Sequence, residues 1–367
     1  MKEIKSLYLH IPFCKDICSY CDFCKMFYNE KFVNDYLNEL EKEIEQNYKK
    51  ETLKTVYIGG GTPSSLSIEE LNKLFSITNK FNIEDEYEFT FECNIVDINA
   101  ELLKKLKDNK VNRISIGIET INEKFFELIN RYNNKDEIKE KIKLVKKYFD
   151  NINIDLMYAF PSETIEDLDK DLDFFKELDV PHISIYSLIL EKNTKLYIKK
   201  TKPIVEELES NMYYHIIKYL EDLGYIHYEI SNFSKNGYES RHNLTYWNND
   251  KYYGFGLSSG GYINNKRYTN TRSLNKYLKG EYILEEDIIT KAIDMENEMI
   301  LGLRKIKGIK KDEFFDKYNF KIEDIFDIIN MIDKNLLEDR EGYIRIPKEK
   351  LYLSNSILVN FIGGSNE

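Results

Sequence analysis

Three cysteines, Cys14, Cys18 and Cys21, follow the first apolar segment of the chain with the spacing C-x3-C-x2-C. Three thiolates in one short loop can converge on a single [4Fe-4S] cluster and leave one of its irons without a protein ligand. An iron that lacks a protein ligand can bind a small molecule. The spacing therefore predicts a cluster with an open coordination position near the start of the chain.

The spacing alone leaves two other uses of these cysteines open, a zinc site and a disulfide framework. Cys24 is a candidate fourth ligand for a zinc ion, although zinc sites usually show C-x2-C pairs. A disulfide framework is disfavoured, because the 367 residues include only five cysteines, four of them within eleven positions, and no secretory signal precedes them. Clustered cysteines in a reducing compartment usually bind metal or act in catalysis, so we expect a cytoplasmic protein.

Composition narrows the class of protein. A hydrophobic content of 42% is enough for a sizeable core, and the length suits one large α/β domain with a smaller one. The formal net charge of −11 argues against nucleic-acid binding. No apolar run approaches the length of a membrane-spanning helix, so we expect no membrane span.

Strand and helix patterns alternate through the first two thirds of the chain. Candidate strands lie at residues 6–11, 55–58, 88–92, 113–117, 153–157 and 182–188. Candidate helices lie at residues 31–48, after Ser67, at residues 102–106 and 138–145, after Thr164, and at residues 205–223. Six such units imply parallel strands with right-handed crossovers, and so an α/β fold of the partial (β/α)6 barrel type.

Polar residues follow the ends of these strands, where a barrel of this kind places its site. The cysteine loop follows the first strand and the run Gly59–Thr62 follows the second. Glu92 ends the third strand, Glu119 lies just past the fourth, and Asp155 lies within the fifth. Glycines at such a position let the backbone approach a ligand closely, although a tight turn explains the run equally well. All of these residues are expected to line one mouth of the barrel.

At this point the sequence resembles a known family. The motifs HIPFC, CSYCDF, GGGTPS, NRISIG, NIDLMYAFP and HISIYSL, in this order, are similar to the coproporphyrinogen-III-oxidase-like branch of the radical S-adenosylmethionine (SAM) superfamily. The resemblance covers nearly the whole chain from Tyr8. It implies that the open iron of the cluster binds SAM. In that superfamily the cluster passes an electron to SAM, whose C–S bond then breaks.

Two subtypes of this branch must be separated: the oxygen-independent oxidases and the HemW-type heme chaperones. Only a few residues precede Tyr8, whereas the oxidases carry a longer arm, and Phe23 stands where they have a further cysteine. The run His242-Asn243-Leu244-Thr245-Tyr246-Trp247 matches the HNxxYW motif of the chaperones. The resemblance therefore implies heme binding at His242, with Tyr246 and Trp247 supporting the ring, and no coproporphyrinogen oxidase activity. The oxidase activity is the alternative.

The family's SAM contacts carry over onto positions of this chain that match its motifs. The resemblance implies SAM contacts at Tyr8, Gly60, Gly61, Thr62, Glu92, Glu119, Arg131 and Asp155. Two positions depart from the usual pattern. Glu119 stands where Gln is usual, which removes a hydrogen-bond donor and adds a negative charge, and Asn133 replaces a frequent His.

The family also suggests a division of the chain and its partners. Residues 1–235 are expected to form the radical SAM core, and residues 236–367 a smaller, mostly helical region of winged-helix-like type. Helices are expected to end near Gly308 and to span residues 312–318 and 322–332, with a short hairpin strand at residues 342–346. The implied partners are heme, a heme-accepting protein and an electron donor to the cluster. A transient contact with a membrane protein and a homodimer are left open.

Overall fold

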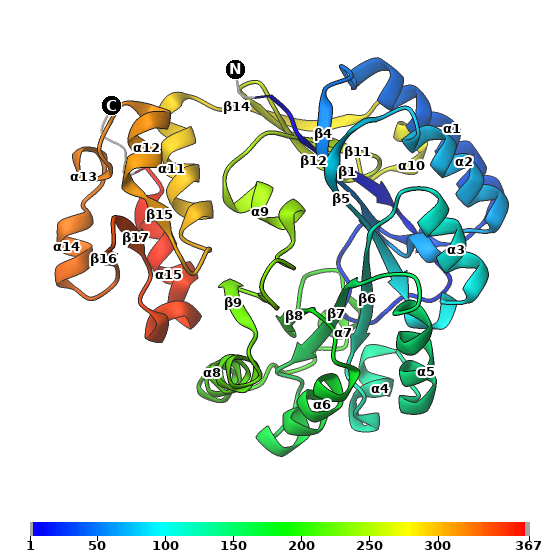
Figure 1. Ribbon diagram of the computed structural model, residues 1–367, viewed down its shortest axis with the longest axis horizontal. Helices are drawn as coiled ribbons and strands as arrows, with labels where there is room; N and C mark the ends of the chain where they lie inside the picture. Colours follow the sequence, from blue (N-terminus) through cyan, green and yellow to red (C-terminus); the bar gives the residue numbers. More distant parts are fainter. Residues whose placement is uncertain (1–2, 364–367) are drawn as a thin grey trace.

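The computed structural model describes residues 3–363 and is built on a curved sheet of mainly parallel strands (Figure 1). Six parallel strands lie side by side in chain order: β1 (Ser6–Ile11), β4 (Thr52–Gly60), β5 (Asn82–Asn94), β6 (Arg113–Glu119), β7 (Asn151–Tyr158) and β8 (His182–Ser187). This order confirms the six predicted strands and their parallel pairing.

Helices follow these strands and cover the outer face of the sheet (Figure 1). They are α1 (Glu30–Asn47), α2 (Ile68–Thr78), α3 (Ala100–Asp108), α4 (Glu123–Ile129), α5 (Lys135–Val145), α6 (Ile165–Leu178) and α8 (Glu206–Asp222). The capping boxes expected from Ser67 with Glu70, and from Thr164 with Asp167, are both formed. Each box satisfies backbone N–H groups that a helix start leaves without a partner.

The sheet extends beyond the six predicted strands on both edges. On one edge β11 (Tyr252–Phe255) pairs with β1 in parallel, and β12 (Gly260–Ile263), β13 (Lys266–Asn270) and β14 (Ile283–Ile288) follow as antiparallel strands. On the other edge β10 (Asn232–Ser234) pairs antiparallel to β8, and β9 (Ile226–Glu229) pairs antiparallel to β10 as the last strand. The sheet thus continues past residue 235, and the division of the chain there stays a prediction.

Short elements connect these units and close the ends of the barrel. They are β2 (Phe13–Cys14), β3 (Met26–Phe27), α7 (Lys195–Ile198), α9 (Arg241–Trp247), α10 (Leu274–Tyr277) and the 3-10 turns η1 (Pro63–Ser65) and η2 (Ile95–Asp97). None of the helices within residues 3–363 is long and apolar enough to cross a membrane.

The C-terminal region packs beside β9 and α9 rather than over α1–α5 (Figure 1). It contains α11 (Lys291–Gly302), α12 (Lys311–Tyr318), α13 (Ile322–Ile325), α14 (Ile328–Asp333) and α15 (Ser354–Leu358), the 3-10 turns η3 (Lys348–Leu353) and η4 (Val359–Phe361), and a small sheet of β15 (Ile309–Lys310), β17 (Tyr343–Arg345) and β16 (Glu338–Arg340). The predicted helix and hairpin content is confirmed, with two corrections. The first helix ends at Gly302, six residues before Gly308, which lies outside it with φ +76°. The expected helix at 322–332 is two helices, because Phe326 is extended.

Candidate functional site

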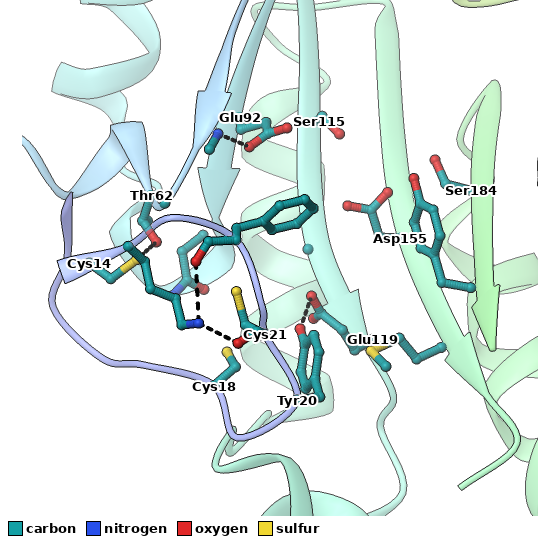
Figure 2. A pocket seen from close by; sticks show the side chains of 18 of the residues that line it. Cys14, Cys18, Tyr20, Cys21, Thr62, Glu92, Ser115, Glu119, Asp155 and Ser184 are labelled. Atoms are coloured by element: carbon teal, nitrogen blue, oxygen red, sulfur yellow. Dashed lines mark hydrogen bonds between the residues drawn. The ribbon is translucent and has the colours of Figure 1, made fainter. Parts of the chain in front are cut away.

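A cavity of about 450 Å³ lies at the carboxyl ends of the parallel strands. Alternate residues of β6 and of β7 line it, as the pleat of a strand requires. On β6 these are Arg113, Ser115, Gly117 and Glu119, in order from the floor to the mouth. Figure 2 shows the loop that carries the cysteines at one end of this cavity, with Ser115, Asp155 and Ser184 farther along the strands.

The three predicted cluster ligands all line this cavity. Cys14, Cys18 and Cys21 are free thiols on the loop after β1, and Figure 2 shows their sulfurs around one region. The loop is fixed by backbone hydrogen bonds, including Ser19 N–H to the Ile129 carbonyl at 2.9 Å. Thr62 also donates its hydroxyl to the Cys14 sulfur at 3.4 Å. The loop is therefore held in place by the protein itself.

Cys24 does not join these three cysteines. Its side chain is 8% exposed and its sulfur lies 3.8 Å from the carbonyl oxygen of Arg272, outside the residues that line the cavity. The zinc alternative depended on Cys24 as a fourth ligand, and this orientation does not supply one. Among residues 3–363, no three His, Cys, Asp or Glu side chains gather closely enough for a single metal ion. The three sulfurs thus surround a volume, as ligands to separate irons of a cluster would.

Burial makes the three thiols poor acids on their own. It raises the pKa of Cys14 to about 11 and also raises the pKa values of Cys18 and Cys21. Thiolates are the form that binds metal, so a positively charged group must bind in order to deprotonate these buried side chains. The donor set and its loop fit a [4Fe-4S] cluster with three protein ligands.

The glycine run lets three parts of the site pack closely. Gly60 has φ +117°, and its N–H donates to the Glu92 carboxylate at 3.0 Å. A β-carbon at Gly59 would lie 2.6 Å from the Glu92 carboxylate, and one at Gly60 would lie 2.5 Å from the His10 ring. A side chain at position 60 therefore meets His10 first. The close approach that these glycines permit is between β1, β4 and β5, while Gly60, Gly61 and Thr62 line the cavity.

Glu92 accepts two hydrogen bonds at the end of β5. Tyr57 donates its hydroxyl at 2.7 Å, and the Gly60 N–H donates at 3.0 Å. Burial nevertheless dominates and raises the pKa of Glu92 to about 7. Asp155 on β7 accepts a hydrogen bond from Asn153 at 2.8 Å, and burial also raises its pKa. Both carboxyl groups line the cavity, and burial makes each of them harder to ionise than a surface acid.

Glu119 and Arg131 form a buried ion pair at the mouth. Arg131 Nη1 donates to Glu119 Oε1 at 3.2 Å, and the 3.1 Å approach of Nε to Oε2 is an ion-pair contact rather than an aligned hydrogen bond. Tyr20 donates to the same carboxylate at 3.0 Å. Although burial opposes it, the Glu119 carboxylate holds the pKa of Arg131 above its ordinary value. The negative charge expected at Glu119 is thus balanced by Arg131.

Backbone geometry directs the side chain of Glu119 toward Arg131. Glu119 has φ +65°, and the pairing of β6 with β7 shifts register between Gly117 and Glu119. Asn133 braces the same turn, because its amide donates to the carbonyls of Ile118 and Thr120 at 2.7 and 2.8 Å. The replacement of His by Asn at position 133 therefore supplies two donors to the strand end that carries Glu119.

Four predicted contact residues do not line the cavity. Tyr8 points its hydroxyl at His10 Nδ1, 3.1 Å away. His242 is 1% exposed, and both ring nitrogens have partners: Nδ1 lies 2.8 Å from the Thr55 hydroxyl and Nε2 lies 2.8 Å from the Tyr246 hydroxyl. Trp247 lies under the Arg304 guanidinium, with 5.7 Å from that group to the ring centroid. From the same motif, Asn243 does face the cavity.

Sequence reasoning missed several lining residues, notably Tyr20, Tyr57, Arg113 and Asn243. The period of two in the strand NRISIGIE places Arg113 on the same face as Ser115, Gly117 and Glu119, so alternation was a usable signal for Arg113. Tyr20 and Tyr57 had no comparable signal, because nothing local marks which of the many tyrosines point inward.

Comparisons with known proteins agree with this geometry. The sequence pattern of the radical SAM superfamily matches residues 8–175. The chain is 37% identical to the heme chaperone HemW of Lactococcus lactis, and the match covers 99% of this chain and 98% of that protein. It is also 37% identical to the heme chaperone HemW of Bacillus subtilis, and that match covers 98% of this chain and 100% of that protein. The structure resembles Escherichia coli coproporphyrinogen III oxidase (HemN), a radical SAM enzyme, with a TM-score of 0.86 over 98% of this chain and 90% of that one. At 19% identity this last likeness shows the fold alone.

Proposed function

Because this chain belongs to the HemW heme chaperones of the radical SAM superfamily, we propose that it binds heme and delivers it to an acceptor protein. The observation that carries the proposal is the 37% identity to proteins named heme chaperone HemW over almost the full length of both chains. The proposal includes action in the cytoplasm, an electron donor to the cluster and no part for nucleic acid.

We further propose that Cys14, Cys18 and Cys21 hold a [4Fe-4S] cluster, with SAM on its open iron. The bound cluster would supply an iron coordination position and an electron. The protein supplies the surroundings: Glu92 and Asp155 offer carboxylate acceptors for the amino and hydroxyl groups of SAM, and the remaining proposed contacts are Tyr8, Gly60, Gly61, Thr62, Glu119 and Arg131. The convergence of most of these residues on one cavity supports this assignment.

Heme contact through His242, Tyr246 and Trp247 is part of the proposal, and it requires that one ring nitrogen of His242 become available to the heme iron. Nδ1 of His242 is engaged with Thr55, so Nε2 is the nitrogen available for iron after exchange of the Tyr246 hydroxyl. Burial lowers the pKa of His242 to about 3, so its imidazole is neutral and keeps a lone pair for a metal at neutral pH. Axial ligation therefore requires the Tyr246 hydroxyl to leave Nε2 and the buried His242 ring to become accessible to the iron.

One preparation tests the function against its enzymatic alternative. The protein is reconstituted with iron and sulfide without oxygen, then divided between a heme titration and an assay of coproporphyrinogen III turnover with SAM and a reductant. The proposal expects about one heme per chain, transfer of that heme to an apo-hemoprotein, and no loss of coproporphyrinogen. Turnover of coproporphyrinogen without stable heme binding would replace the chaperone proposal with the oxidase.

A further inference from the structure

The floor of the cavity holds a buried cation with unused hydrogen-bond donors. Arg113, on β6, is 1% exposed, and its guanidinium lines the cavity. Its Nε and Nη2 atoms have no hydrogen-bond partner among the described residues. A buried charge without a partner is strongly unfavourable, so natural structures pair such groups with a side chain or a ligand.

Neighbouring side chains do not supply that partner. Glu92 and Asp155 line the same cavity and attract the Arg113 charge, yet among residues 3–363 neither accepts a hydrogen bond from its Nε or Nη2. Burial raises the pKa of Glu92 to about 7, so the negative charge of Glu92 is incomplete near neutral pH, and burial also raises the pKa of Asp155. Asn153 is fully engaged, because its amide nitrogen donates to Ser115 and Asp155 while its oxygen contacts His182 and Ser184. The Arg113 donors are thus left for something in the cavity.

Arg113 also lies far from the cysteine loop. Along β6 it is six residues from Glu119, about 20 Å at the ordinary rise of a strand. Arg131, not Arg113, approaches a cluster ligand, with Nη1 4.0 Å from the Cys18 sulfur. A small molecule whose amino-acid group sits at the cluster would meet Arg131, whereas Arg113 faces whatever occupies the opposite end of the cavity.

We propose that Arg113 forms a carboxylate-binding subsite at the cavity floor and that it takes a propionate of heme. The subsite deepens the proposed function and rests on it. A guanidinium presents parallel N–H donors in a plane that matches a carboxylate, which makes arginine suited to this ligand. The cavity lining also includes the polar side chains of Ser115 and Asn243, which suits a propionate.

The test compares heme with heme dimethyl ester, in which both carboxylates are blocked. Both are titrated into the reconstituted protein, for wild type, Arg113→Gln and Arg113→Lys. Wild type should bind heme about tenfold more tightly than the ester, the size expected for one charge-assisted hydrogen-bonded pair. Arg113→Gln should abolish that preference and Arg113→Lys should keep part of it. The ratio is taken within each variant, so a general loss of stability does not imitate the effect.

SAM and a second arginine serve as controls. The affinity for SAM, measured in the same preparations, should stay within about twofold of wild type in Arg113→Gln. If this variant loses SAM binding while its ratio of heme affinity to ester affinity is unchanged, the carboxylate that Arg113 binds belongs to SAM and the proposal is overturned. Arg267, a partly buried arginine outside the cavity that bonds to Asn249, provides the matched variant Arg267→Gln, which should keep the preference. If wild type binds heme and its ester equally, the subsite is refuted while the chaperone function stands. If wild type binds neither, both proposals fail.

Discussion

The carboxyl group of Glu92 should make SAM binding depend on pH. Burial raises the pKa of this group to about 7, even though Tyr57 and the Gly60 N–H donate to it. SAM carries a positive sulfonium, so the ionised carboxylate is the form that favours it. Binding should therefore release a proton and strengthen as the pH rises through 7.

The size of this effect follows from the titration of one group. With a pKa of about 7, Glu92 is about 9% ionised at pH 6 and about 91% ionised at pH 8. If only the ionised form binds SAM well, affinity should rise about tenfold over this range, which equals about 1.4 kcal/mol. Most of the change should fall between pH 6 and pH 8, and a plateau should follow at higher pH.

The stability of the protein without SAM should show the opposite dependence on pH: the free energy of unfolding should fall as the pH rises. The folded-state pKa of Glu92 lies above its ordinary value of 4.5, so the fold favours the protonated group. Its contribution to stability is therefore complete below pH 4.5 and is lost as the pH rises through 7. The loss between pH 5 and pH 8 should be about 2.5 kcal/mol.

Equilibrium dialysis of radiolabelled SAM against the reconstituted protein, without oxygen, measures this dependence at pH 6, 7 and 8. Glu92→Gln is the matched control, because it keeps the size of the side chain and cannot ionise. The amino group of SAM titrates near pH 8 in both proteins, so the difference between the two profiles isolates Glu92. Parallel profiles for wild type and Glu92→Gln would refute the assignment of this carboxylate to SAM.

Substitutions at the cysteine loop, the glycine run and the histidine test the other assignments. Cys24→Ser should keep four irons per chain and Cys18→Ser should lose them by iron analysis; equal losses would make Cys24 a ligand. Gly60→Ala should lower the free energy of unfolding by about 1–3 kcal/mol in denaturant titrations, because its methyl group meets the His10 ring; an unchanged value would mean that the loop relaxes freely. His242→Ala should shift the Soret band of bound heme, whereas Tyr246→Phe, which frees Nε2, should bind heme at least as tightly as wild type. An unchanged spectrum in His242→Ala would remove this histidine from the heme site.

Much of the site could be predicted because it depends on strand order. The carboxyl ends of adjacent parallel strands meet at one edge, so residues that follow those strands in the sequence must lie together. Glu92, Glu119 and Asp155 were placed in this way, and all three line the cavity. The cysteines were placed by their local spacing, which left Cys24 open as a fourth ligand; the structure separates Cys24 from the other three.

The surroundings of His242 could not be predicted, because they depend on distant segments. Its ring contacts Thr55 and Tyr57 on β4, almost two hundred positions earlier in the chain. A motif of six residues on a helix gives the spacing of its side chains but not which face the sheet will cover. The strands from β11 to β14 were missed for a related reason: they are short, and their pairing with β1 is decided by an edge that the local sequence does not describe.

The two arginines of the cavity differ in a way that suits a protein that must release its ligand. The two terminal nitrogens of Arg131 at the mouth donate to Glu119, to the Asn94 side chain and to the Gly117 carbonyl, so the surroundings of the cysteine loop are already in place. Arg113 at the floor keeps donors unused. A preorganised mouth favours a group that stays bound, because little has to be ordered when it binds. A floor that offers an anionic ligand the donors of one guanidinium can hold that ligand and still let it leave, which is what delivery to an acceptor requires.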